Sequence, residues 1–349
     1  MAGTNRNALW LTAAAVGVGT ITALTALKHA RPKFDFQNKT VLITGGSRGL
    51  GLVLAGMLAG KGARLAICAR DEAELERAEK DLQARGAQVL TLVCDVRNQS
   101  EVARTVDAVC KHYGQTDVLI NNAGLIQVAP LENLTQTDFE DAMATNFWGA
   151  FYMMNAVLPE MKQRGAGRIV NVASIGGKLP VPHLASYCAA KFALVGLSGA
   201  MRAELVKDDI YVTTVCPGLM RTGSPVNATF KGQNEKEYAW FSISDSLPFT
   251  SVSAEKAAAQ IIEACENGRA ELIISPQAKL AAKFNALFPE LTSDISVFAN
   301  RFLPSAGGIG ERSALGKDSQ SAASPSFLTT LSDSAAFRNN ELEPDEQTA

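Results

Sequence analysis

The chain has 349 residues, 47% of them hydrophobic, and a formal net charge of −2 at pH 7. This length and apolar content suffice for a large core in one or two domains, and the near-neutral charge gives no attraction for nucleic acid. The 6 cysteines include no C-x-x-C pair and the 3 histidines show no metal-ligand spacing, so we expect buried thiols in a reducing compartment, no disulfide framework and no metal site.

The first predicted element is an uncharged segment over residues 8–27, between an N-terminal tip (1–7) and a basic linker (28–38). Its length matches one bilayer span, and the basic residues after it favour a single-pass membrane protein with its catalytic domain in the cytoplasm. Two alternatives stay open. One is a cleaved signal peptide, although basic residues stand where small cleavage-site residues would be expected. The other is a buried or interfacial helix, because Thr and Gly residues lower the apolar character of the segment.

A glycine-rich turn over residues 44–51 follows a short apolar run and leads into an apolar helical segment. A strand, a glycine turn and a helix in this order place backbone N–H groups and a helix N-terminus against a phosphate. Gly45, Gly49 and Gly51 allow backbone conformations or close approaches that a Cβ would block. Taken alone, the turn is equally compatible with a tight loop in any parallel α/β protein.

Strand-like apolar runs then alternate with helical patterns along the chain. This alternation predicts a doubly wound, seven-stranded parallel sheet of the Rossmann type over residues 39–276, covered by helices on both faces and preceded by the N-terminal hydrophobic helix. The expected strands are Thr40–Thr44, Arg64–Ala69, Gln88–Cys94, Val118–Asn121, Arg168–Val172, Tyr211–Val215 and Ala270–Ser275. The expected helices include Asp71–Arg85, Ser100–Tyr113, Thr137–Met161, Ala185–Val206 and Ala254–Asn267.

Two further segments follow the predicted sheet. Residues 277–304 are expected to be a helical extension with clustered Leu and Phe. It could be a packed hairpin, a cover for the substrate cleft, a dimer contact or a surface against the bilayer. Residues 305–349 are rich in Ser, Ala, Gly and acidic residues, a composition that buries too little apolar surface to offset the entropy of ordering, so we predict a disordered tail.

Polar residues stand at the ends of several predicted strands. Asp95 ends the third strand, Asn121–Gly124 end the fourth, and Ser174 follows the fifth. The carboxyl ends of such strands face the ligand crevice, although helix capping and turn formation would explain each residue singly. Tyr187 and Lys191 lie one helical turn apart, so both project from one face, where the cation would lower the pKa of the phenol. An exposed pair on a helix surface is the plain alternative.

Together with Asn146 and Pro217-Gly218, this ordered set resembles the short-chain dehydrogenase/reductase family, in its branch with TGxxxGxG, NNAG and YxxxK motifs. The resemblance covers about two thirds of the chain and implies an oxidoreductase that acts on CH–OH donors or on ketones. It implies the following cofactor-binding residues: Thr44, Gly45, Ser47, Arg48, Gly49, Leu50, Gly51, Arg70, Asp95, Val96, Asn122, Ala123, Gly124, Tyr187, Lys191, Pro217, Gly218 and Thr222.

The same resemblance implies four catalytic residues. Tyr187 would give or take the proton, and Ser174 would hydrogen-bond the substrate oxygen. Lys191 would bind the nicotinamide ribose and lower the pKa of the tyrosine, while Asn146 would support a water-mediated proton relay. Ala190 stands where relatives often have Ser or Thr, and this departure removes no proton-transfer group.

The end of the second strand predicts the type of dinucleotide. An acidic residue there would bind the ribose 2′-OH of NAD, but Arg70 falls at or next to that position, and Arg48 lies in the glycine turn. Two guanidinium groups suit a 2′-phosphate. We therefore expect NADP(H) to be preferred, with NAD(H) possible. Asp71 argues against this preference, because it is an acidic residue next to Arg70 that could bind the ribose of NAD. Its alternative role is to cap the following helix.

The substrate is expected to be a lipophilic small molecule, such as a fatty-acyl, steroid or retinoid-like ketone or alcohol. Aromatic residues follow the sixth strand, where the family keeps its variable lid, although they could instead pack the lid onto its own domain: Phe230, Tyr238, Trp240 and Phe241. The resemblance also implies a homodimer or homotetramer. The alternative function is a non-catalytic NADP-binding scaffold or redox sensor, which would have no need of all four catalytic residues.

Overall fold

The structure is a computed structural model that describes residues 33–342. The predicted N-terminal tip, the predicted membrane span and the first part of the basic linker lie outside these residues. Within the described range, no helix combines the length and the apolar character needed to cross a bilayer.

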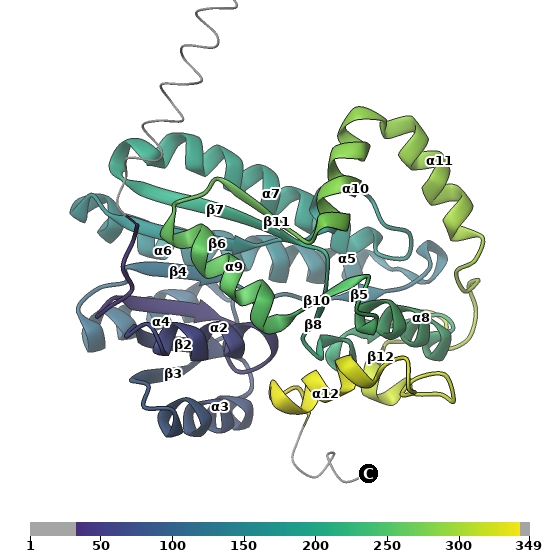
Figure 1. Cartoon of the computed structure of the whole chain (residues 1–349), viewed down its shortest axis with the longest axis horizontal. Coiled ribbons are helices and arrows are strands. Elements are labelled where there is room, and N and C mark those ends of the chain that lie inside the picture. Colours follow the sequence, from purple (N-terminus) through teal and green to yellow (C-terminus); the bar gives the residue numbers. More distant parts are fainter. Residues whose placement is uncertain (1–32, 343–349) are drawn as a thin grey trace, which may run out of the picture. The chain divides into compact units, whose positions relative to one another are not determined.

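A seven-stranded sheet forms the centre of the fold, as the sequence predicts (Figure 1). Its order is β11-β7-β6-β4-β1-β2-β3, and all neighbouring strands are parallel. The strands are β1 (Thr40–Thr44), β2 (Arg64–Ala69), β3 (Val89–Val93), β4 (Val118–Asn121), β6 (Gly167–Val172), β7 (Ile210–Pro217) and β11 (Glu271–Ile274). Because β1 pairs with both β2 and β4, the strand order reverses there, which places a ligand crevice at the carboxyl ends of β1 and β4.

Helices cover both faces of this sheet. On one face lie α2 (Gly49–Ala59), α3 (Glu72–Ala84) and α9 (Ala254–Glu266). On the other lie α4 (Gln99–Tyr113), α6 (Gly149–Arg164) and α7 (Ala185–Leu205), and α5 (Gln136–Met143) packs against α7. Strands that are buried on both faces must be apolar throughout, which is why β1 and β4 read as nearly continuous hydrophobic runs.

The predicted helix over residues 137–161 is interrupted in the structure. A π-helical turn, Ala144–Trp148, separates α5 from α6. Asn146 lies in this turn and is buried, and its side chain accepts a hydrogen bond from Leu125 N (3.1 Å) and donates one to Leu125 O (2.9 Å). These two bonds hold the Asn146 side chain against the loop that follows β4.

A lid region follows β7 and forms two small sheets. β8 (Leu219–Arg221) pairs with β10 (Ser251–Ser253), and β9 (Thr229–Phe230) joins β5 (Gln127–Val128) to β12 (Ala314–Leu315). α8 (Asn234–Ser246) packs over them. The rings of Phe230, Tyr238 and Phe241 are buried against one another, so these three aromatic residues pack the lid onto its own domain.

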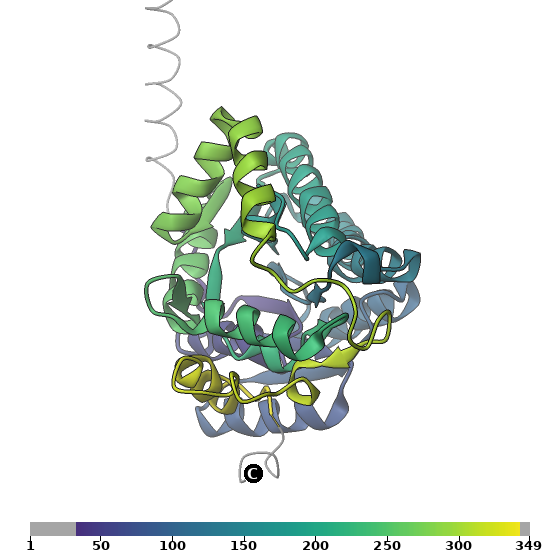
Figure 2. The same ribbon diagram turned by 90° about the vertical axis from the view of Figure 1, so that its right-hand side faces the viewer.

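The C-terminal region contains three helices among the described residues. α10 (Pro276–Leu287) and α11 (Pro289–Asn300) form the helical extension, with many exposed apolar side chains. α12 (Thr330–Arg338) lies on the opposite side of α8 from this hairpin (Figures 1 and 2). Residues 305–342 thus differ from the predicted disorder. Composition misses this helix because it packs through small residues: Ala335 and Ala336 are fully buried.

Candidate active site

The glycine turn lies at the carboxyl end of β1, where α2 begins. Gly45 (φ +62°) and Gly49 (φ +55°) have left-handed backbone conformations that favour glycine. A Cβ atom on Gly51 would lie 2.0 Å from the carbonyl oxygen of Gly45, so this position has no room for a side chain. Leu50 is buried in the first turn of α2. The turn therefore presents bare backbone at the N-terminus of a helix, the arrangement that binds phosphate.

Hydrogen bonds connect this turn to the end of β4. The Thr44 hydroxyl accepts bonds from the backbone N–H groups of Asn122 and Ala123, both at 3.0 Å. In return, Asn122 Nδ2 donates to the carbonyl oxygens of Thr44 (3.1 Å) and Gly45 (3.0 Å). Four predicted cofactor residues thus meet at the point where the strand order reverses.

Three of the four predicted catalytic residues lie around Gly124 and the end of β6. A Cβ on Gly124 would lie 3.0 Å from Asn146 Oδ1 and 3.6 Å from Lys191 Nζ. The buried Lys191 ammonium donates to Val172 O (3.0 Å), two residues before Ser174. Burial lowers the pKa of Lys191 to about 8, because the charged form loses its hydration.

Tyr187 and Ser174 form the reactive pair of the site. A Cβ on Gly176 would lie 3.3 Å from Tyr187 Cε1 and 3.5 Å from Ser174 Oγ, and Ser174 Oγ accepts from Gly176 N (3.0 Å). Burial raises the pKa of Tyr187 to about 12, and the Ser174 side chain opposes this rise only in part. The Lys191 ammonium lies 5.6 Å from the Tyr187 ring centroid. The pKa of Tyr187 is therefore raised and not lowered as predicted, because loss of hydration is the largest cause of its shift and the Lys191 cation is not among the causes.

The predicted adenosine end of the site contains Arg70, Asp95 and Val96. Burial tends to raise the pKa of Asp95, but hydrogen bonds from Arg97 lower it overall, and Val96 is buried. Arg70 is exposed and forms no ion pair within the described residues. Asp71 accepts a hydrogen bond from Glu74 N (2.8 Å) at the start of α3. Asp71 thus caps a helix, which was the alternative to a role in binding NAD.

Arg48 and Ser47, also at this end, have acidic partners. Arg48 Nη1 lies 2.9 Å from Glu74 Oε1, and Ser47 Oγ donates to Glu74 Oε2 (2.9 Å). Arg48 Nε lies 3.4 Å from Glu341 Oε2. Burial raises the pKa of Glu341, and Arg48 and Asn227 oppose that rise. Two carboxylates therefore neutralise Arg48, one of the two arginines predicted to bind a 2′-phosphate.

The predicted nicotinamide end lies where β7 leads into the lid. Pro217 is the last residue of β7, and Gly218 N donates to Ile274 O (3.3 Å). The buried Thr222 accepts a hydrogen bond at its carbonyl oxygen from Asn339 Nδ2 (2.9 Å). All predicted site residues thus border the carboxyl ends of the sheet strands or the lid that follows them.

Sequence reasoning missed one part of this site, the segment 339–341 after α12. It contacts the glycine turn and Thr222, although more than a hundred residues separate it from either. No motif marks the segment, and only the fold brings it to the turn.

Comparison with known proteins gives one family. A family model described as short chain dehydrogenase matches residues 39–231. A dehydrogenase/reductase SDR family protein 7-like from Anopheles gambiae is 33% identical over 74% of this chain and 82% of its own length. A ketoacyl reductase from a Nostoc species is 37% identical over 54% of this chain and 66% of its own. The crystal structure of levodione reductase superposes with a TM-score of 0.60 at 27% identity, covering 70% of this chain and 99% of that one.

Proposed function

The chain belongs to the short-chain dehydrogenase/reductase family of oxidoreductases, and on this premise we propose that it transfers hydride between NADP(H) and a carbonyl or hydroxyl group of a lipophilic substrate. The observation that carries the proposal is the meeting of Ser174, Tyr187, Lys191 and Asn146 at one edge of the sheet. A scaffold that only binds nucleotide would need none of these contacts.

The glycine turn fits a dinucleotide, because Gly45, Gly49 and Gly51 leave its backbone uncovered by side chains of its own. When bound, the nicotinamide supplies or accepts the hydride. Ser174 is suited to donate a hydrogen bond to the substrate oxygen, where negative charge develops during reduction. Tyr187, with its pKa near 12, holds the proton that this oxygen takes up. Lys191 holds positive charge behind the tyrosine, and Asn146 fixes the neighbouring loop.

Arg70 supports the preference for NADP(H), since it is exposed and forms no ion pair in the described part of the chain. We expect full-length protein in detergent to oxidise NADPH over a panel of lipophilic ketones, and to use NADH less well. Arg70→Ala should lower kcat/KM for NADPH by about 10- to 100-fold, the worth of a charge-assisted contact, and leave NADH use unchanged. Arg104→Ala, an exposed arginine on α4, is the matched control. Equal use of both cofactors by wild type would contradict the proposal.

The lipophilic substrate is supported by the surroundings of Tyr187. Ile126, Val181 and Trp240 are partly buried apolar side chains packed on the same cluster as this tyrosine. One relative is a ketoacyl reductase, so an acyl ketone is the substrate class to test first. If no ketone supported turnover while NADPH still bound, the alternative of a nucleotide-binding scaffold would gain support.

We also propose that the protein is anchored in a membrane by residues 8–27, with the catalytic domain cytoplasmic. The proposal is supported by the apolar sequence of that segment and by exposed apolar side chains on the α10–α11 hairpin, among them Leu287, Val297 and Phe298. A carbonate wash of membranes is expected to leave full-length protein in the pellet and to release a chain lacking residues 1–30. Release of the full-length protein would contradict a spanning anchor.

An oligomer is the remaining part of the proposal. The resemblance to the family implies pairing through the helices 137–161 and 185–206. Trp148 and Phe192, which lie within these ranges, are exposed large apolar side chains. Their exposure supports a homodimer or homotetramer built on this face.

A further inference from the structure

The C-terminal helix α12 is packed closely against the lid. A Cβ on Gly223 would lie 2.3 Å from Ala336 Cα, so the helix backbone touches the lid backbone directly. Ser332 N donates to Ser246 Oγ (3.2 Å) on α8. Asn340 has a left-handed conformation (φ +58°), and it ends the helix by turning the chain toward the glycine turn.

The residues after α12 occupy hydrogen-bonding groups of the predicted cofactor site. The N–H of Gly49, the first residue of α2, donates to Asn339 O (2.8 Å). Asn340 Nδ2 donates to Ser47 O (2.8 Å), and Asn339 Nδ2 donates to Thr222 O (2.9 Å). The segment therefore crosses from the lid to the glycine turn and contacts both.

Glu341 places a carboxylate at the N-terminus of α2. A Cβ on Gly49 would lie 2.5 Å from Glu341 Oε1, so the carboxylate lies directly on the bare face of the turn. Asn227 Nδ2 donates to Glu341 Oε2 (2.8 Å), and Arg48 Nε lies 3.4 Å away from the same oxygen. The residue is buried. A helix N-terminus, a backbone N–H group and an arginine are the partners that a phosphate would take.

We propose that residues Asn339–Glu341 act as an intramolecular competitor of the dinucleotide, with the Glu341 carboxylate in place of a cofactor phosphate. The segment must leave the glycine turn before the cofactor binds there, so the C-terminal region is autoinhibitory. This inference rests on the proposed function only in taking the glycine turn as the dinucleotide site.

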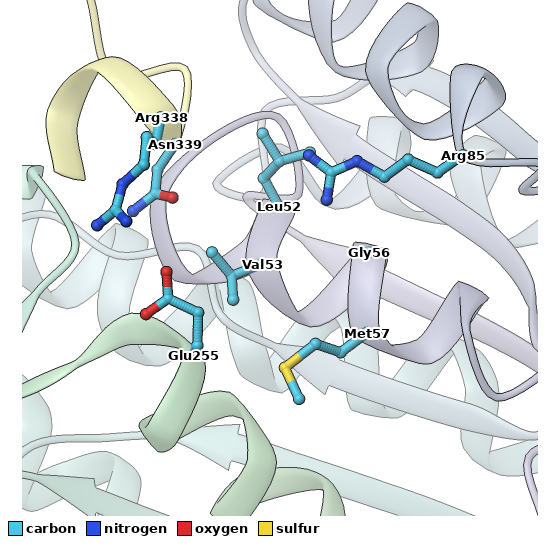
Figure 3. A pocket seen from close by; sticks show the side chains of 8 residues that line it. All are labelled: Leu52, Val53, Gly56, Met57, Arg85, Glu255, Arg338 and Asn339. Carbon is cyan, nitrogen blue, oxygen red and sulfur yellow. The ribbon is translucent and has the colours of Figure 1, made fainter. Parts of the chain in front are cut away.

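The packing around the segment is compatible with its release. A groove of about 380 Å³ lies beside it, between α2, α9 and the end of α12 (Figure 3). Figure 3 shows the Glu255 carboxylate turned toward the side of the groove where Arg338 and Asn339 lie. Polar contacts and a hollow flank hold the segment less firmly than an apolar core would, since such contacts are exchanged for water when it moves.

Glu341→Ala in the full-length protein should bind NADPH about tenfold more tightly than wild type, the factor expected when one to two competing hydrogen bonds are removed. The dissociation constant is measured by fluorescence titration, which needs no turnover. Glu341→Gln keeps the shape and removes the charge, and it should show part of the gain. Glu311→Ala, which removes an exposed carboxylate, is the matched control and should bind like wild type.

Hydrogen exchange gives the second measurement. NADPH should speed exchange of the amides of residues 335–341 and slow that of residues 44–51. If NADPH slowed exchange in both segments, residues 339–341 would act as a lid over the cofactor. Either this result or a Glu341→Ala variant that bound NADPH no more tightly than wild type would refute the proposal that the segment competes with the dinucleotide. If folded wild type and a chain ending at Arg338 both bound neither NADPH nor NADH, the proposed function would fail as well. The two failures are thus distinguishable.

Discussion

Replacing Tyr187 with Phe is expected to lower kcat for carbonyl reduction by about 10²–10⁴-fold, the usual contribution of a positioned general acid. The pKa of about 12 keeps the hydroxyl of this residue protonated at neutral pH. Only the proton donor is lost, because the phenyl ring still fills the same space. Single-turnover oxidation of NADPH measures the chemical step, and the dissociation constant of NADPH should change by less than about threefold, under 1 kcal/mol.

Tyr238→Phe is the matched control for this prediction. Tyr238 is a buried tyrosine of the lid whose pKa burial also raises to about 12. Removal of its hydroxyl should affect stability and leave the chemical step unchanged. If the Tyr187 variant reduced every ketone as fast as wild type did, another group would be the proton donor.

The second large effect is expected at Lys191. Burial lowers its pKa to about 8, so the ammonium is charged below that pH and neutral above it. If the charge is needed beside Tyr187, kcat/KM for reduction should fall as the pH rises through 8, with a limiting slope of about tenfold per pH unit, because kcat/KM reports the pKa of the free enzyme. Lys191→Met, which has no charge, should lose about 10²-fold or more at pH 7.

Lys191→Arg separates the effect of the positive charge from the effect of its titration. A guanidinium stays protonated at every accessible pH, so this variant should keep some activity and lose the decline above pH 8. A wild-type profile that was flat from pH 7 to pH 10 would exclude titration of Lys191 from the reaction. Thermal melting of each variant checks that loss of the bond to Val172 O has not unfolded the chain.

The sheet was predictable because its strands are short, mostly apolar runs. The limits of β1, β2 and β4 agree with the prediction at both ends, since each run of buried residues is bounded by polar or turn-forming residues. The motif residues were predictable for a related reason. Chemistry in this fold lies at the carboxyl ends of strands, so a polar residue such as Ser174 at a strand end stands out.

The π-helical turn at Asn146 could not be predicted from periodicity. It adds a single residue to a helical turn, and the apolar positions of α5 and α6 remain helical on either side of it. The tyrosine pKa was mispredicted for a different reason. Spacing places a lysine beside a tyrosine, but only the fold determines how much water each side chain loses.

The ordered C-terminal region escaped prediction because its contacts are long-range and its side chains small. Ala335, Ala336 and Gly223 carry little hydrophobic signal, yet they allow two backbones to touch. Asn339 and Asn340 donate to backbone carbonyl groups, which no sequence motif reveals, and Asn340 Oδ1 accepts from Arg77 Nε (2.8 Å).

The pairing of β12 with β9 has a consequence for any shortened form of this protein. Ala314–Leu315 cover one edge of Thr229–Phe230, whose other edge pairs with β5. A chain cut after residue 276 would keep every motif on which the family resemblance rests and would leave that edge bare. Unpaired main-chain groups on a strand edge recruit other strands, so such a fragment should aggregate. The β12 strand thus protects the edge of the lid sheet from pairing with other chains, independently of any role in catalysis.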